Sequence, residues 1–233
     1  RLSSVELYGP DGEPRADHYA MPPDGVPFRI LAFAPDGSLL GLRSENMNSN
    51  ALVRIRPITG RLGRLTNLSV RAFVSAPEPL IAGFVTTGAD ATRALVRAIG
   101  PGLNAFGVDD AMTDPQLVLA RNGETSALND NWDISLTSRF NEVGAFALTV
   151  GSKDAAIESA VLSGNYTGIV SSPTGGSGTS LLELYESAPP AAAGRRFINI
   201  SARGPVTPNR PLIVGFAITG EVPVTVLIRG AGP

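Results

Sequence analysis

The clearest candidate for metal chemistry in the sequence is the acidic and amide-rich run NDNWD at residues 129–133. Calcium prefers about six to eight oxygen ligands, and Asp114 from a preceding strand could add one. The run lacks the glycine and the terminal glutamate of an EF-hand loop, and clusters of Asp and Asn also form turns and caps. We therefore expect either a structural turn or a weak calcium site at Asp114, Asp130 and Asp133.

Other residues that could take part in chemistry have simpler structural roles. Trp132, the sole tryptophan, could stack on a sugar ring or plug one end of a β-sandwich. The glycine run at 174–180 contains no lysine, so a hairpin turn between Val170 and Leu181 explains it better than a phosphate loop does. The chain has no cysteine and one histidine, which excludes thiol nucleophiles and mechanisms that use two histidines. Because no catalytic constellation is complete, we expect no enzymatic activity.

Charge and composition exclude further classes of function. The 19 basic and 21 acidic residues nearly balance, which argues against nucleic acid as a main partner. The sequence has no run of about 18 apolar residues, so we expect no membrane span. With 26 glycines, 19 prolines and only 6% aromatic residues, a turn-rich all-β chain is favoured over long helices.

An internal repeat organises the chain. Residues 64–101 align without a gap to residues 196–233 at an offset of 132, with 16 of the 38 positions identical. A weaker echo relates SSVELY at 3–8 to SLLELY at 180–185. These matches predict five segments: a closing strand of a preceding unit (1–8), an inserted β-hairpin segment (9–63), a complete repeat (64–186), a Pro/Ala linker (187–195) and the first strands of the next repeat (196–233).

Within the complete repeat, apolar residues alternate with polar ones from Thr66 to Val74, which is typical of a half-buried strand. Further strands are expected at 80–87, 94–99, 116–121, 156–162, 166–171 and 180–186. Short helical elements are expected after Pro101, closed by Gly107, and from Ile134 to Val143, with Asp133 as N-cap. These elements predict an antiparallel β-sandwich of jelly-roll or immunoglobulin-like type.

The apolar faces of these strands define the expected core. It comprises Leu68, Val70, Leu80, Phe84, Val96, Leu117, Leu119, Ile169, Leu182 and Leu184.

Several polar residues recur between the two copies of the repeat, although residues on a solvent-exposed face would be free to differ between the copies. We expect them to bond a neighbouring strand, loop or repeat, with the alternative that Arg71 and Arg97 each satisfy carbonyls within their own unit. The candidate interface residues are Asn67, Ser69, Arg71 and Arg97, with their equivalents Asn199, Ser201, Arg203 and Arg229.

The order RLTNLSVRA, PLIAGFVTTG, ALVRAIGPGLNAFGV, DPQLVLA, NDNW, VGAFAL, GSKDAA, YTGIVS and LLELYE resembles a known bacterial repeat. That repeat occurs in many copies in very large secreted or surface proteins of environmental bacteria, and the resemblance spans about 64–186 and restarts at 196. The later half, from DPQLVLA through GNYTGIVSS, also resembles pre-peptidase C-terminal domains, which are accessory β-sandwiches of secreted bacterial enzymes. The resemblance implies export and a role in adhesion or scaffolding.

We therefore expect a non-enzymatic structural or adhesive repeat of a secreted or cell-surface protein. Its partners would be neighbouring repeats or copies of itself in a filament or tandem array. Strand addition could supply the contacts, because the strands at 1–8 and 196–233 would otherwise expose unpaired edges. The alternative is an accessory calcium- or polysaccharide-binding module of a secreted hydrolase.

Overall fold

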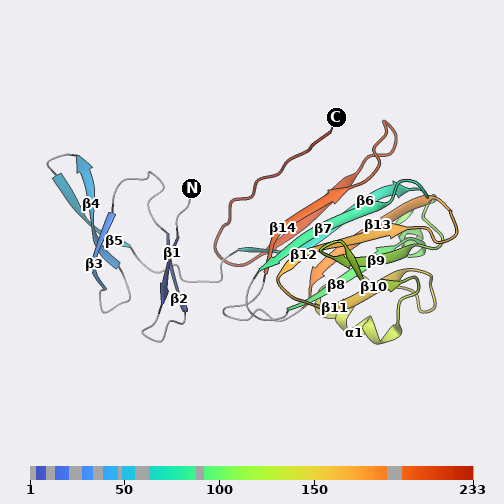
Figure 1. Cartoon of the computed structure of the whole chain (residues 1–233), viewed down its shortest axis with the longest axis horizontal. Coiled ribbons are helices and arrows are strands. Elements are labelled where there is room, and N and C mark those ends of the chain that lie inside the picture. The colour runs from blue at the N-terminus through green and yellow to red at the C-terminus, as the bar shows by residue number, and fades with distance from the viewer. Residues whose placement is uncertain are drawn as a thin grey trace. The chain divides into compact units, whose positions relative to one another are not determined.

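The structure is a computed structural model of the chain (Figure 1). It describes residues 4–8, 14–20, 28–33, 39–46, 49–55, 63–87, 92–187 and 196–232. Among these residues no helix has the length and apolar character needed to cross a membrane.

The strands before residue 56 form two small antiparallel sheets. In the first, β1 (Ser4–Tyr8) pairs with β2 (Pro14–Ala20). In the second, β4 (Leu39–Asn46) lies between β3 (Phe28–Phe33) and β5 (Ser49–Ile55). The inserted segment 9–63 therefore contains strands that pair antiparallel, while the connections between them lie outside the described residues.

A second compact unit, residues 64–219, holds the remaining strands. Their bounds are β6 (Arg64–Val74), β7 (Leu80–Thr87), β8 (Thr92–Ile99), β9 (Gln116–Arg121), β10 (Glu124–Asn129), β11 (Ala155–Val161), β12 (Gly164–Ser171), β13 (Gly178–Glu186), β14 (Arg196–Arg203) and β15 (Ile213–Thr219). They pair in the order β10-β9-β12-β7-β14-β6-β13-β8-β11, and β15 pairs with β6 beside this path.

The predicted antiparallel all-β fold is confirmed. The hydrogen-bonded path is continuous, because β14 connects its two halves through the single pair Phe197 and Leu65. It is nearly closed, because its end strands β10 and β11 contact each other. One half consists of β10, β9, β12, β7 and β14, and the other of β6, β13, β8 and β11 with β15. The segment 196–219, expected to open a separate repeat, lies in the same compact unit as the complete repeat.

Alternating faces of the strands bury one apolar cluster between the two halves. In β6, Leu68, Val70, Ala72 and Val74 are buried, as the alternation in the sequence predicts. Every expected core residue is buried except Ile169, for which the prediction is wrong. In β12 the inward positions are Tyr166, Gly168 and Val170, so Ile169 faces the other side and is half-buried.

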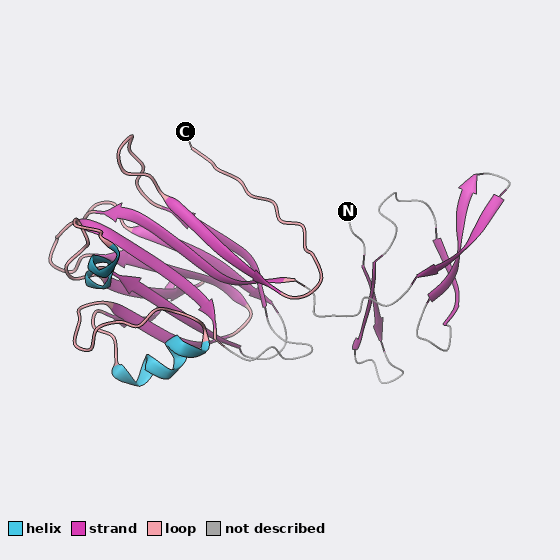
Figure 2. Cartoon of the chain, turned by 180° about the vertical axis from the view of Figure 1, so that it is seen from behind, coloured by secondary structure: helices cyan, strands magenta, loops and turns pink. Residues whose placement is uncertain are grey.

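A second apolar cluster covers the opposite face of β8. Residues 130–153 pack over this face, and α1 (Thr137–Glu142) contributes the buried Phe140. Figure 2 shows the helices as short elements outside the strands. Because β8 is covered on both faces, Leu95, Arg97 and Ile99 are as buried as the residues between them.

The expected helical elements are confirmed. The 3-10 helix η1 (Pro101–Phe106) ends at Gly107 in a left-handed conformation, with φ of 75°. The 3-10 helix η2 (Ile134–Leu136) leads into α1, and the Asp133 carboxylate accepts a hydrogen bond from the Ser135 backbone N–H.

The glycine run 174–180 is not a hairpin turn. β12 pairs with β7 and β9, whereas β13 pairs with β6 and β8, so the connection crosses from one half of the path to the other.

Phe84 tests this arrangement of the core, because it contacts two other aromatic rings. Its ring centroid lies 5.0 Å from that of Tyr166, on which it stacks, and 5.3 Å from that of Phe197. Phe84→Ala should lower the free energy of unfolding by about 3–5 kcal/mol, measured by urea denaturation. Ile169→Ala, on the half-buried face of β12, is the control and should cost clearly less. Equal losses in the two variants would contradict the assigned faces.

Candidate repeat interface

Two strand–turn–strand segments meet in the 64–219 unit. We call residues 64–87 the first arch and residues 196–219 the second arch, because in each the two strands belong to opposite halves of the path. β14 pairs with β7, and β15 pairs with β6. The second arch therefore extends both halves of the path at once.

Side chains reinforce this backbone pairing. Phe197 is buried in the core against Phe84, and Ile200, Ala202 and Leu212 pack against the same cluster. At the turn of the second arch, the guanidinium carbon of Arg210 lies 3.3 Å from the centroid of the Phe73 ring. The contact between the arches is thus apolar at its centre and polar at its margin.

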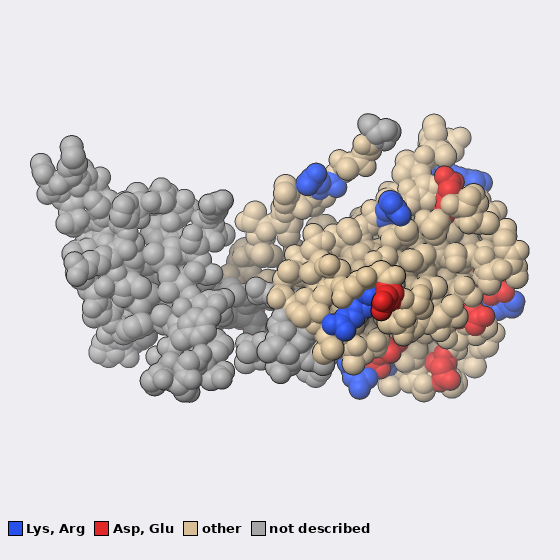
Figure 3. All heavy atoms as spheres, viewed as in Figure 1, with Lys and Arg blue, Asp and Glu red and all other residues tan. Residues whose placement is uncertain are grey.

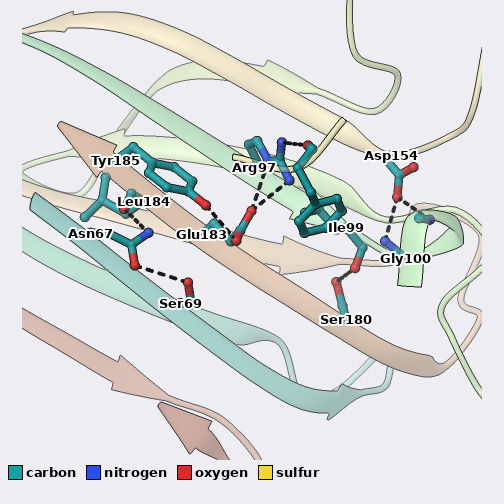
Figure 4. A network of polar contacts seen from close by, with 12 residues as sticks. Asn67, Ser69, Arg97, Ile99, Gly100, Asp154, Ser180, Glu183, Leu184 and Tyr185 are labelled. Atoms are coloured by element: carbon teal, nitrogen blue, oxygen red, sulfur yellow. Dashed lines mark hydrogen bonds and ion pairs between the residues drawn. The ribbon is translucent and has the colours of Figure 1, made fainter. Parts of the chain in front are cut away.

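The recurring polar residues of the first arch lie on β6, between β13 and β15. Asn67 donates a hydrogen bond from Nδ2 to the Leu184 carbonyl at 3.2 Å, and the Ser69 hydroxyl donates to Oδ1 of Asn67 at 3.3 Å (Figure 4). Arg71 is exposed and lies opposite Ile213 of the second arch. Asn67 thus bonds a strand of its own unit, while Arg71 lies at the contact between the arches.

Their equivalents in the second arch lie on β14, which pairs with β7. The Ser201 hydroxyl donates to the Gly83 carbonyl at 3.5 Å, and Asn199 and Arg203 occupy neighbouring exposed positions of the same ladder. Arg229 is exposed beyond this strand.

Arg97 is not an interface residue. Its side chain is completely buried, and its Nε donates to Oε2 of Glu183 at 3.0 Å while Nη2 lies 2.9 Å from the same oxygen. Nη1 donates to the Phe146 carbonyl at 2.7 Å, and the guanidinium lies 4.6 Å from the centroids of the Phe140 and Phe146 rings. The alternative that Arg97 is satisfied within its own unit is therefore the correct one.

Glu183 and Tyr185 complete this buried network, although neither was among the site residues expected from the sequence. The Tyr185 hydroxyl donates to Oε1 of Glu183 at 2.9 Å (Figure 4). Burial raises the pKa of Tyr185, and the negative charge and hydrogen bond of Glu183 raise it further. The signal was present in the sequence, since the echo of SLLELY in SSVELY retains both residues as Glu6 and Tyr8.

Asp154 anchors the turn that follows β8. Its buried Oδ1 accepts hydrogen bonds from the backbone N–H groups of Gly100 at 2.8 Å and Gly102 at 3.1 Å, and Oδ2 accepts from the Ser152 hydroxyl at 2.6 Å. Gly100 is required here, because an added Cβ would lie 2.1 Å from the Met112 carbonyl oxygen. The carboxylate therefore has a structural role.

The structure does not bring the three expected calcium ligands together. Asp114 forms an ion pair with Lys153 at 2.7 Å, and Asp133 caps η2. Hydrogen bonding from the Ser135 side chain, and then from its backbone N–H, lowers the pKa of Asp133. Oδ1 of Asp130 accepts from Nδ2 of Asn131. Within the described part of the chain, no three His, Cys, Asp or Glu residues are grouped so that they could hold a metal ion.

Trp132 plugs the second cluster and does not present its ring for stacking on a sugar. It is 9% exposed, and its indole lies 5.3 Å from the Phe140 ring. The indole N–H is shared between the Thr149 carbonyl at 3.3 Å and the Ser152 hydroxyl at 3.2 Å.

An open groove of about 500 Å³ lies beside the contact between the arches. Arg71 and Arg210 line it together with Asp109 and Asp110, so its charges are mixed. Figure 3 likewise shows basic and acidic side chains dispersed over the visible face of the described residues, without a cluster of one sign.

Comparisons with protein-family models, with curated proteins and with solved structures found no match to this chain.

The buried ion pair predicts a large penalty for removing one partner. Arg97→Met leaves the Glu183 carboxylate buried without its cation and should lower the free energy of unfolding by about 3–5 kcal/mol. Adding Glu183→Gln removes the uncompensated charge and should recover most of this loss. Arg93→Met, at the exposed pair with Glu158, is the control and should cost at most about 1 kcal/mol. A loss for Arg97→Met as small as the control's would contradict the buried network.

The raised pKa of Tyr185 predicts a loss of stability in alkali. The folded state favours the neutral phenol, so this contribution is fully present below the pKa of the unfolded chain, about 10, and is lost as the pH rises above it. The free energy of unfolding of the wild type should therefore fall more steeply above this pH than that of Tyr185→Phe.

Absorbance of tyrosinate gives an independent check. The chain has four tyrosines, and Tyr185→Phe should leave the titration amplitude of the folded protein unchanged below the alkaline transition. In urea the same substitution should remove one tyrosine's share of the amplitude. Loss of that share in the folded protein as well would contradict the burial of this hydroxyl.

Proposed function

We propose that the chain is a structural or adhesive repeat module without catalytic activity, and that it acts outside the cell or at its surface. It associates with neighbouring repeats or with copies of itself in an array or filament. The support comes from how the second arch sits on the complete repeat and from the apolar surface that it leaves exposed.

One observation carries the proposal: apolar positions that are buried in β7 are exposed at their equivalents in β15. Phe84 is 2% exposed, whereas its equivalent Phe216 is 38% exposed. Ala82 and Val214 differ in the same way, at 3% and 48%. β15 thus has the apolar pattern of a strand that packs against a core, but Val214 and Phe216 remain exposed.

This surface is suited to another protein surface of the same kind. The residues Ile213, Val214, Phe216 and Ile218 form a continuous exposed apolar strand. Among the described strands β15 pairs with β6 alone. An exposed apolar strand of this type favours association, because association buries apolar surface and satisfies backbone hydrogen bonds. In a tandem array the further strands of a repeat would cover it, and in a filament another copy would.

Sedimentation velocity of the whole chain at increasing concentration tests this proposal. The wild type should associate, and Phe216→Glu should shift it towards monomer by placing a charge on the apolar surface of β15. Leu128→Glu is a matched control, since Leu128 is also exposed but lies on β10. Wild type that remains monomeric throughout, or an equal effect of both substitutions, would contradict association through the second arch.

A further inference from the structure

The two strand ladders between the arches are related by a reciprocal register. Under the offset of 132, β14 is the equivalent of β6 and β15 is the equivalent of β7. Exchanging the arches therefore converts the β7–β14 ladder into the β6–β15 ladder. The pair Ile81–Arg203 of the first ladder corresponds to the pair Ile213–Arg71 of the second. In the same way, the pair Gly83–Ser201 corresponds to the pair Gly215–Ser69.

The irregularities of the two ladders correspond as well. In the β7–β14 ladder the register shifts between Phe197 and Asn199, so that Ile198 is the extra residue. In the β6–β15 ladder the shift leaves out Thr66, which is the equivalent of Ile198. The turns of the arches are closed by equivalent bridges, Ser75 with Glu78 and Thr207 with Arg210. The two arches are thus related by an approximate twofold axis.

Some of the pairs that meet across this axis consist of residues that are identical in the two repeats. Serine faces glycine in both ladders, and arginine faces isoleucine in both. A Cβ added at Gly83 would lie 2.7 Å from the Ser201 hydroxyl oxygen, whereas one added at Gly215, opposite Ser69, would meet no atom within 4 Å. The recurrence of Ser69 and Arg71 thus coincides with equivalent positions in the two ladders.

We propose that the edges of β6 and β7 form a self-recognition surface which, when the second arch is displaced from it, binds the first arch of a second copy of this chain as a twofold pair. Within one chain the second arch occupies this surface, and a second copy offers the same residues through its own first arch. A twofold contact uses the same patch on both partners, so it closes on a pair. Growth of an array or filament depends instead on the exposed face of β15. The inference rests on the proposed function in that it names the partner of the repeat.

Grafting the first arch in place of the second tests recognition inside the whole chain. Residues 196–219 are replaced by a second copy of residues 64–87, which has the same length. The melting temperature should stay close to that of the wild type and well above that of a control graft with the same residues in scrambled order. A graft that destabilises the chain as much as the scrambled control contradicts self-recognition.

Cysteine cross-linking reports the register, since the chain has no cysteine of its own. In the grafted chain, Arg71→Cys with cysteine at position 213 should form an intramolecular disulfide, because directly opposed residues in a ladder are close enough to be bridged. Cysteines at positions 71 and 217 are the out-of-register control and should remain largely reduced. Equal cross-linking of the two pairs contradicts the reciprocal register.

A second arm of the experiment tests a second copy directly. Ser201→Pro with Gly215→Pro removes ladder hydrogen bonds and displaces the second arch from β6 and β7. In this background, Arg71→Cys with Ile81→Cys should give disulfide-linked dimers, and Arg71→Cys with Val85→Cys should give far fewer. A chain that stays monomeric, or that cross-links equally with both pairs, overturns the proposal.

These results are distinguishable from failure of the proposed function. The graft and its disulfide are measured within one chain, so they succeed or fail whether or not the wild type associates through the exposed face of β15. Conversely, if the wild type associated but the grafted arch did not pair with β6 and β7, the proposed function would stand and self-recognition would be contradicted.

Discussion

Pairing of backbone groups at strand edges is the constraint on which the 64–219 unit depends. Within the complete repeat, β6 pairs on one edge with β13, and β7 pairs on one edge with β12. Their other edges would expose unpaired N–H and C=O groups, which is costly where they adjoin an apolar core. The second arch covers both edges together and supplies Phe197 to the core beside Phe84.

The buried polar network stabilises β8 and β13 on their outer face, which the second apolar cluster covers. Arg97 on β8 and Glu183 on β13 are opposed in one ladder, so their ion pair fastens two adjacent strands. The same guanidinium donates to the Phe146 carbonyl and stacks against Phe140, which ties the covering segment 130–153 to the strands. Removing a charge from such a site costs more than the pair itself contributes, because the partner stays buried. We therefore regard Arg97 as part of the architecture of the repeat.

Alternation of apolar residues was sufficient to predict most strands, because one face of each packs on the core. It failed at Ile169, where the inward position of β12 is taken by Gly168, whose added Cβ would lie 3.3 Å from Val96 Cγ1. It missed β10, since residues 124–129 are mainly polar and face solvent. Arg97 was misplaced at an interface because periodicity does not reveal that 130–153 covers β8 on its second face. The recurrence of Ser69 and Arg71 did locate the contact between the arches, although reciprocal pairing appears only in the ladders.

We infer that the second arch and the edges of β6 and β7 form one cooperative structure. Hydrogen–deuterium exchange of the whole chain, followed by mass spectrometry of peptides, measures this most directly, because protection reports the free energy of local opening. We expect peptides from β14 and β15 to be protected together with those from β6 and β7. Ser201→Pro with Gly215→Pro should remove protection from the newly exposed edges of β6 and β7. Exchange of β14 and β15 at the rate of an unstructured peptide in the wild type, with β6 and β7 still protected, would contradict it.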